Sequence, residues 1–158
     1  YYNLKMFKNN TILIISLFFL LSCGYSTIHS QNKNLNFTLT GLELNGDRET
    51  NNFIKSRLKK FLNNESEKNL KVSINTSYNK ISVAKNLTGN TTDFKLIINL
   101  DLTVVNINTN VEKLASFSET FTIKKNENNY EQKNYENIIK NNMSQLLSNK
   151  IIYYLSKS

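Results

Sequence analysis

Alternation of apolar and polar residues is clearest between Phe94 and Val104. Every second residue there is apolar, and the intervening positions are mostly polar: Lys95, Asn99, Asp101 and Thr103. This period of two predicts a β-strand with one face in a hydrophobic core. After a turn at residues 106–110 the alternation resumes over residues 114–124, where one face carries Ala115, Phe117, Phe121 and Ile123. The two segments predict a long antiparallel β-hairpin.

Two further strands are expected earlier in the chain. Residues 35–39 alternate, and after Gly41 the pattern continues one position out of phase through Leu42 and Leu44, which predicts a β-bulge at the glycine. Residues 72–78 alternate in the same way, and this second strand extends to about Val83. Asn45-Gly46-Asp47 predicts the turn that follows the first strand.

The remaining periodic segments have helical spacing. Residues 49–62 predict an amphipathic helix, with one apolar face made of Phe53, Ile54, Leu58, Phe61 and Leu62. Residues 130–155 predict a long closing helix. Its expected apolar stripe consists of Tyr135, Ile138, Ile139, Met143, Leu146, Leu147, Ile151 and Tyr154.

The order β-α-β-β-β-α predicts an α+β fold. A right-handed crossover through the first helix makes the first two strands parallel neighbours or near-neighbours, and the other strands pair antiparallel. Two helices covering one face of a four-stranded mixed sheet give a two-layer sandwich. We expect a single domain over residues 36–158.

The N-terminal segment has the pattern of an export signal. Lys5 and Lys8 precede an uncharged apolar run over residues 12–21, which ends in Leu20-Leu21-Ser22-Cys23. That ending matches the bacterial lipobox, in which the cysteine is linked to diacylglycerol. A transmembrane helix needs about 20 apolar residues, roughly twice what this run supplies, and the alternative for Cys23 is a buried free thiol. We therefore predict a cleaved signal peptide over residues 1–22, with translation starting at Met6, and lipidation of Cys23.

Residues 23–35 are expected to form a polar tether between the lipid and the domain. His29, the sole histidine, lies in this tether and is expected to be solvated rather than catalytic. The formal net charge is +8. An exported protein does not meet nucleic acid, so this charge favours anionic lipid, lipopolysaccharide or an acidic protein surface as a partner.

Little in the chain indicates catalysis. No His, Cys and carboxylate positions have metal-ligand spacing, and Cys23 is the sole cysteine. Asp101 and Glu119 could be cross-strand neighbours forming an acid/base pair, but solvent-facing charges paired with lysines are the favoured interpretation. We expect no enzyme, no cofactor and no metal. Ile97 and Val105 interrupt the polar face of the third strand, either as ordinary sheet surface or as contacts to a partner or an acyl chain.

Taken together, these features resemble the LPS-assembly lipoprotein (LptE) family. The resemblance rests on Cys23-Gly24-Tyr25, the helix that begins Asn51-Asn52-Phe53-Ile54, the pair Thr91-Thr92 entering the third strand, and the closing helix. It implies an outer-membrane lipoprotein that plugs the LptD β-barrel, helps assemble it and assists lipopolysaccharide delivery to the cell surface. Gly24 after the lipidated cysteine favours the outer membrane as the destination.

Site residues implied by the resemblance are basic. Family members often carry a basic residue entering the third strand, where this chain has Asp93. Lys80, Lys85 and Lys95 flank the loop that would point into the barrel and are the candidate contacts to lipopolysaccharide; the alternative for each is a solvated lysine. The alternative function is a lipid-anchored adaptor of another envelope secretion or assembly complex, because small α+β domains recur in such roles.

Overall fold

Four strands and two helices make up the part of the chain that the computed structural model describes, residues 36–63 and 65–158. In chain order they are β1 (Thr38–Gly46), α2 (Arg48–Leu58), β2 (Asn69–Lys85), β3 (Thr91–Asn106), β4 (Val111–Lys124) and α3 (Asn129–Lys157). This is the predicted β-α-β-β-β-α order. Cys23, His29, the signal segment 1–22 and the tether 23–35 lie outside the described residues.

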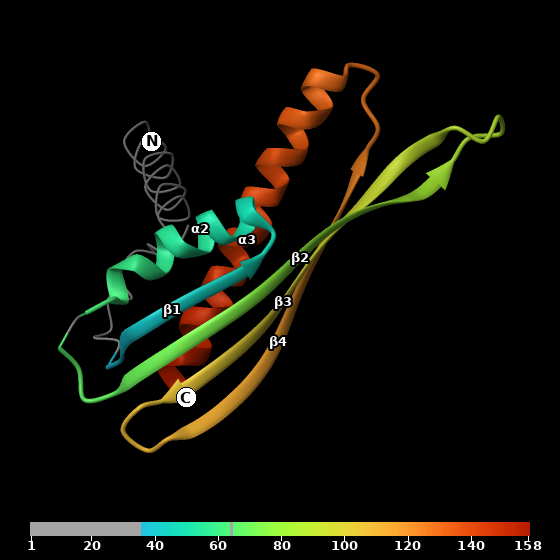
Figure 1. The fold of residues 1–158 in the computed structure, drawn as a ribbon. Helices are drawn as coiled ribbons and strands as arrows, with labels where there is room; N and C mark the ends of the chain where they lie inside the picture. The colour runs from blue at the N-terminus through green and yellow to red at the C-terminus, as the bar shows by residue number, and fades with distance from the viewer. Residues whose placement is uncertain (1–35, 64) are drawn as a thin grey trace, which may run out of the picture. The chain divides into compact units, whose positions relative to one another are not determined.

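The sheet has the strand order β1-β2-β3-β4. β1 and β2 are parallel, whereas β2 with β3 and β3 with β4 are antiparallel, so the sheet is mixed as predicted. The register of β1 shifts between Leu39 and Gly41, which confirms the bulge. β2 and β3 continue well past the end of β1 and form a projecting arm (Figure 1).

The hydrophobic core lies between the sheet and the two helices. The face of β3 that was predicted to be apolar is buried from Leu96 to Val104, and it packs with Val72 and Ile74 of β2. α2 contributes Ile54 and Leu58 to this core, and α3 packs against β3 and β4. Both helices contact each other on this side, which leaves the other face of the sheet without a helix in the described residues.

Helix α2 begins at a capped end and stops earlier than predicted. The Asp47 carboxylate accepts the backbone N–H of Thr50 at 2.9 Å, a side-chain cap that satisfies one of the free N–H groups at a helix start. The α-helix ends at Leu58 and continues as a 3-10 turn over Lys59–Phe61. Leu62 is therefore not helical: it forms an isolated bridge to Leu39, extending the parallel edge.

The buried stripe of α3 differs from the predicted one. Ile139, Met143, Leu147 and Ile151 are buried as expected, but Tyr135, Ile138 and Leu146 are exposed. Their places in the interface are taken by residues with short or polar side chains: Lys140, Ser144 and Ser148. Each serine hydroxyl donates to the carbonyl four residues earlier, at 2.8 and 2.7 Å. These hydroxyls need no partner outside the helix, and they let it pack closely.

Gly46 marks the point where β1 turns into α2. Its φ is +96°, in the left-handed region that favours glycine, and a Cβ at this position would lie 1.8 Å from the Thr76 carbonyl oxygen. The turn predicted at Asn45-Gly46-Asp47 is present, and the contact with β2 makes glycine a requirement there.

Candidate functional site

The arm formed by the far ends of β2 and β3 carries the lysines predicted from the sequence. Pairing of β1 with β2 ends at Gly46 and Thr76, and β2 continues to Lys85. At the tip, the Asn86 side-chain oxygen accepts the backbone N–H groups of Thr88 and Asn90, which closes the loop. Three large apolar side chains on the arm are exposed: Ile81, Val83 and Leu87.

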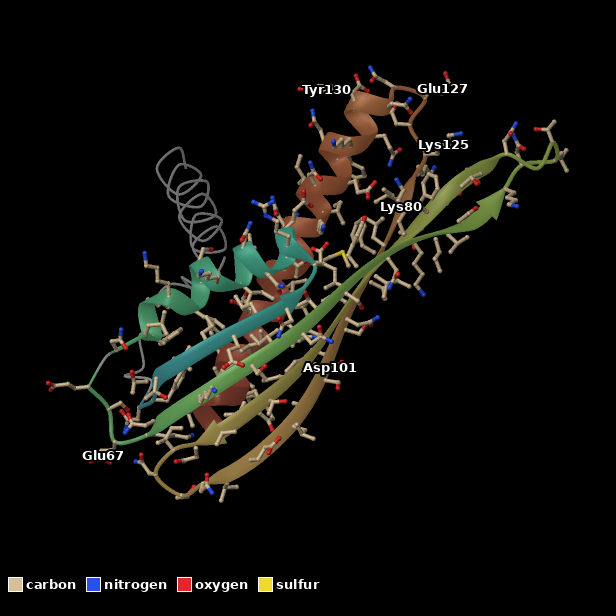
Figure 2. The ribbon with its side chains drawn as sticks, viewed as in Figure 1. Glu67, Lys80, Asp101, Lys125, Glu127 and Tyr130 are labelled. Carbon is tan, nitrogen blue, oxygen red and sulfur yellow. The ribbon has the colours of Figure 1, made fainter. Side chains whose placement is uncertain are left out.

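Lys80 is held on the helix side of the sheet where the arm begins (Figure 2). Its ammonium lies 2.5 Å from the Glu136 carboxylate on α3 and 4.4 Å from the centre of the Phe94 ring. The Tyr78 hydroxyl donates to the other oxygen of the same carboxylate. Partial burial alone would raise the pKa of Glu136, but the hydrogen bonds from Lys80 and Tyr78 outweigh it and lower that pKa.

Lys95 and Lys85 are not brought together with Lys80. In the antiparallel register Lys95 is opposite Ile81, on the face away from the helices, whereas Lys80 is opposite Leu96 on the helix face. Lys85 lies beyond two register shifts, at the exposed end of β2. The three candidates are therefore distributed over the arm, and Lys80 already has a partner.

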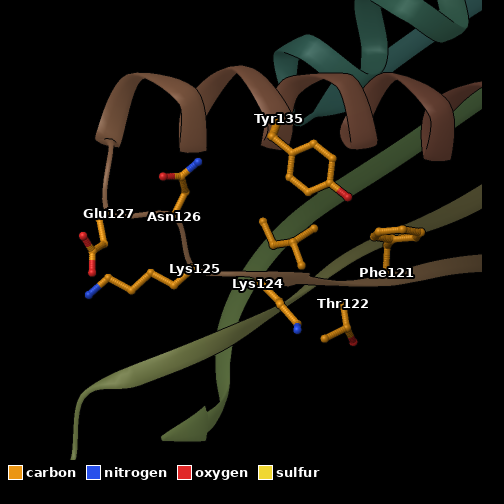
Figure 3. Close-up of a pocket in the computed structure, with 8 residues that line it drawn as sticks. Phe121, Thr122, Lys124, Lys125, Asn126, Glu127 and Tyr135 are labelled. Atoms are coloured by element: carbon orange, nitrogen blue, oxygen red, sulfur yellow. The ribbon is translucent and has the colours of Figure 1, made fainter. Parts of the chain in front are cut away.

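An open cleft of about 680 Å³ lies between the end of β4 and the first turns of α3 (Figure 3). Its apolar lining comes from Phe121 and Ile123 of β4, with Tyr135 of α3 across from them. Lys124 and Lys125 lie along its margin, together with Asn126 and Glu127. Neither of these lysines takes part in an ion pair within the described residues.

The cleft exists because α3 diverges from the sheet at this end. The connection between β4 and α3 is short and fixed: Asn126 N–H donates to the Gln132 side chain at 2.6 Å, and Asn128 caps the helix. Phe121 was correctly predicted on the inward face of its strand, but it is 43% exposed because α3 lies away from the sheet there. Sequence periodicity placed Tyr135 in the core and so missed the cleft.

A second polar cluster ties α3 to the start of α2. Lys140 is only 7% exposed, and its ammonium lies 3.0 Å from Asp47 and 2.8 Å from Glu49. It also sits 4.3 Å from the centre of the Tyr78 ring. The pKa of Tyr78 is raised well above its usual range, mainly because the side chain is partly buried and also because its hydroxyl donates to the Glu136 carboxylate. This cluster connects three elements and has the features of a structural contact.

The predicted neighbours Asp101 and Glu119 do not meet. Asp101 pairs with Ser116 and projects from the face without helices, where it accepts the Ser116 hydroxyl at 2.7 Å. Glu119 pairs with Ile98 on the opposite face and forms an ion pair with Lys150 of α3 at 2.7 Å. An acid/base pair is therefore ruled out, and the lysine pairing expected for such charges holds for Glu119. No group of three potential metal ligands gathers in the described part of the chain.

No family model and no curated protein matches the sequence. Among solved structures, rare lipoprotein B from Shewanella oneidensis matches with a TM-score of 0.59 and 11% identity, covering 74% of this chain and 94% of that one. Lipoprotein B from Nitrosomonas europaea matches with a TM-score of 0.55 and 11% identity, covering 77% and 86% of the two chains.

A third structure, a Caulobacter crescentus protein described as a lipoprotein, matches with a TM-score of 0.51 and 11% identity, covering 75% of this chain and 88% of that one. The chain has the fold of these bacterial lipoproteins. At this level of identity the likeness establishes the fold and leaves individual residue roles open. Across residues 36–63 and 65–158, no helix has the length and apolar character needed to cross a membrane.

Proposed function

We propose that the protein is an outer-membrane lipoprotein, anchored through lipidated Cys23, that plugs and helps assemble an LptD-type β-barrel. In this role it assists delivery of lipopolysaccharide to the cell surface. The observation that carries the proposal is the rare lipoprotein B fold, found on a chain whose lipobox precedes the folded unit. The lysines carried by the arm are consistent with a binding role.

The arm is the part that we assign to lipopolysaccharide contact. Lys85 and Lys95 are available for anionic groups, whereas Lys80 contributes by keeping the base of the arm fixed against α3 through Glu136. Contacts between exposed lysines and phosphates are individually modest and weaken with salt. The arm therefore adds to binding in the barrel without dominating it.

Conditional depletion in the native host tests the proposal. We expect loss of the protein to reduce both the folded barrel and the lipopolysaccharide detected on intact cells. A double variant, Lys85→Gln with Lys95→Gln, should restore barrel folding but deliver less lipopolysaccharide; Lys71→Gln, which removes an exposed lysine far from the arm, is the matched control. Unchanged barrel and lipopolysaccharide after depletion would contradict the role, and loss of another envelope complex instead would indicate an adaptor.

The anchor can be tested separately. Two or three acyl chains hold a protein durably on a membrane, at about 0.8 kcal/mol per buried CH₂. Cys23→Ala should therefore move the protein into the soluble periplasmic fraction. If the variant stays with the membrane, the barrel rather than the lipid holds it.

A further inference from the structure

The two edges of the sheet are built differently. On one side β1 has only 9 residues and a register shift, and the uncovered end of β2 beyond it carries two more shifts. On the other side β4 has 14 residues that pair with β3 without any shift. Proteins usually interrupt exposed edges with bulges, short strands or charges, because a regular edge accepts further strands. β4 lacks the first two of these protections.

Charge does not protect β4 either. Glu119 is the only charged residue from Leu114 to Ile123, and its carboxylate is already paired with Lys150 of α3. The strand is also free of proline. Its central part therefore presents an unprotected edge.

The hydrogen-bond pattern shows which backbone groups are free. Lys125 N–H donates to the Thr92 carbonyl at 2.7 Å, and bonded residues alternate along an antiparallel pair. Odd-numbered residues of β4 therefore bond to β3, and even-numbered ones direct N–H and C=O outward. The Tyr154 hydroxyl donates to the Leu114 carbonyl oxygen at 3.5 Å, which shows that the carbonyl of this even-numbered residue is directed away from β3. Tyr154 therefore partly covers the edge of β4 near Leu114. The outward groups from Ser116 to Lys124 remain available.

We propose that the half of β4 next to the cleft, residues 117–124, accepts an extended segment of another protein as a fifth strand. Backbone N–H and C=O groups spaced at alternate residues are matched by another extended backbone, and such strand addition is a common mode of peptide recognition. The cleft beside Phe121, Ile123 and Tyr135 would receive the side chains on one face of the added strand.

The lining defines the chemistry of this segment. Its alternate residues on the helix side meet Phe117, Phe121 and Ile123, with Glu119 between them already paired with Lys150, and would be mainly apolar. Those on the other side meet Ser118, Thr120 and Thr122 and would be small and polar. An acidic residue at the end nearest Lys124 and Lys125 would pair with these lysines. A second copy of the chain fits less well, because it also carries a net positive charge and would add the same lysines. The inference does not rest on the proposed function.

Photocross-linking in the host tests the strand addition on the full, lipidated protein. Benzoylphenylalanine replaces Thr122, whose side chain lies on the edge strand, and cross-linked peptides are identified by mass spectrometry. Thr120→Pro removes an outward N–H without breaking a bond to β3, a position where an edge strand tolerates proline. Ser82→Pro is the matched control on the opposite edge of the sheet. The Ile107 N–H donates to the Asn69 carbonyl, which shows that odd-numbered residues of β2 bond to β3. Even-numbered residues such as Ser82 therefore direct their N–H groups away from β3.

We expect one cross-linked segment of another protein with alternating apolar and polar residues and an acidic end. Thr120→Pro should lower its yield at least about tenfold, which corresponds to the loss of a single strong contact, while Ser82→Pro leaves it unchanged. A cross-link to a second copy or to lipid, no cross-link, or equal loss in both variants would overturn the proposal.

If Thr120→Pro fails to fold, amide hydrogen exchange of the wild-type protein, free and in the complex, tests the same proposal. In the isolated wild-type protein the amides of Ser118, Thr120 and Thr122 should exchange faster than their odd-numbered neighbours. In the purified complex they should become protected. Lack of protection in that complex would equally overturn the proposal.

Discussion

Lys140 offers the sharpest test of how α3 is attached. We expect Lys140→Met to lower the free energy of unfolding by about 2–3 kcal/mol, because breaking a buried ion pair is costly while the methionine retains most of the apolar stem. The ammonium is buried against Asp47 and the Tyr78 ring, whereas its second carboxylate partner, Glu49, is 65% exposed at the side chain.

The magnitude follows from these contacts. A hydrogen bond to a charged group contributes about 1.5–3 kcal/mol, and a largely desolvated cation over an aromatic ring contributes up to about 2 kcal/mol. The exposed pair with Glu49 adds less than about 1 kcal/mol. The variant also avoids the cost of desolvating the ammonium, which offsets part of these lost contributions. The expected net loss in the free energy of unfolding is therefore about 2–3 kcal/mol.

The assay is urea denaturation followed by far-ultraviolet circular dichroism, with Lys71→Met as the matched control. Lys71 pairs with Glu43 at 2.9 Å, but both side chains are more than half exposed, so its loss should cost less than about 0.5 kcal/mol. A double-mutant cycle with Asp47→Asn isolates the coupling between the two groups. Equal losses for Lys140→Met and Lys71→Met, or no coupling to Asp47, would show that this ion pair does not hold α3 in place.

Two further predictions concern backbone geometry and pH. Gly46→Ala should cost more than about 2 kcal/mol, because its Cβ would meet the Thr76 carbonyl, whereas Gly89→Ala, which has a positive φ in open space, should cost only about 1 kcal/mol; thermal melts compare them. Folding lowers the pKa of Glu136, so its stabilisation is present above the unfolded value and is lost as the pH falls through the folded one. The wild type should therefore lose stability below pH about 4 more steeply than Glu136→Gln, and equal slopes would contradict the assignment.

The strands could be predicted from the sequence because apolar residues alternate along the face of each strand that is directed toward the helices. Alternation from Phe94 to Val104 specified which residues are buried, and the phase change at Gly41 located the bulge. The ends of α2 were less predictable, because Leu62 has the correct helical spacing but is drawn into a bridge with Leu39. Local patterns decide the type of an element, whereas its boundary depends on tertiary contacts.

The candidate site was less accessible to sequence reasoning. Whether Tyr135 is buried depends on where α3 departs from the sheet, and whether Lys140 can be buried depends on Asp47 and Tyr78, residues distant in the sequence. The separation of Lys80 from Lys95 depends on the register between β2 and β3. The free edge of β4 likewise becomes evident only when the strand order is known.

We propose that this protein is the plug of an LptD-type barrel. Affinity purification of the tagged, lipidated protein from detergent-solubilised outer membrane, with partners identified by mass spectrometry, tests it most directly. We expect recovery of a large β-barrel in stoichiometric amount. Recovery of a different envelope complex, or of the protein without any barrel, would contradict it.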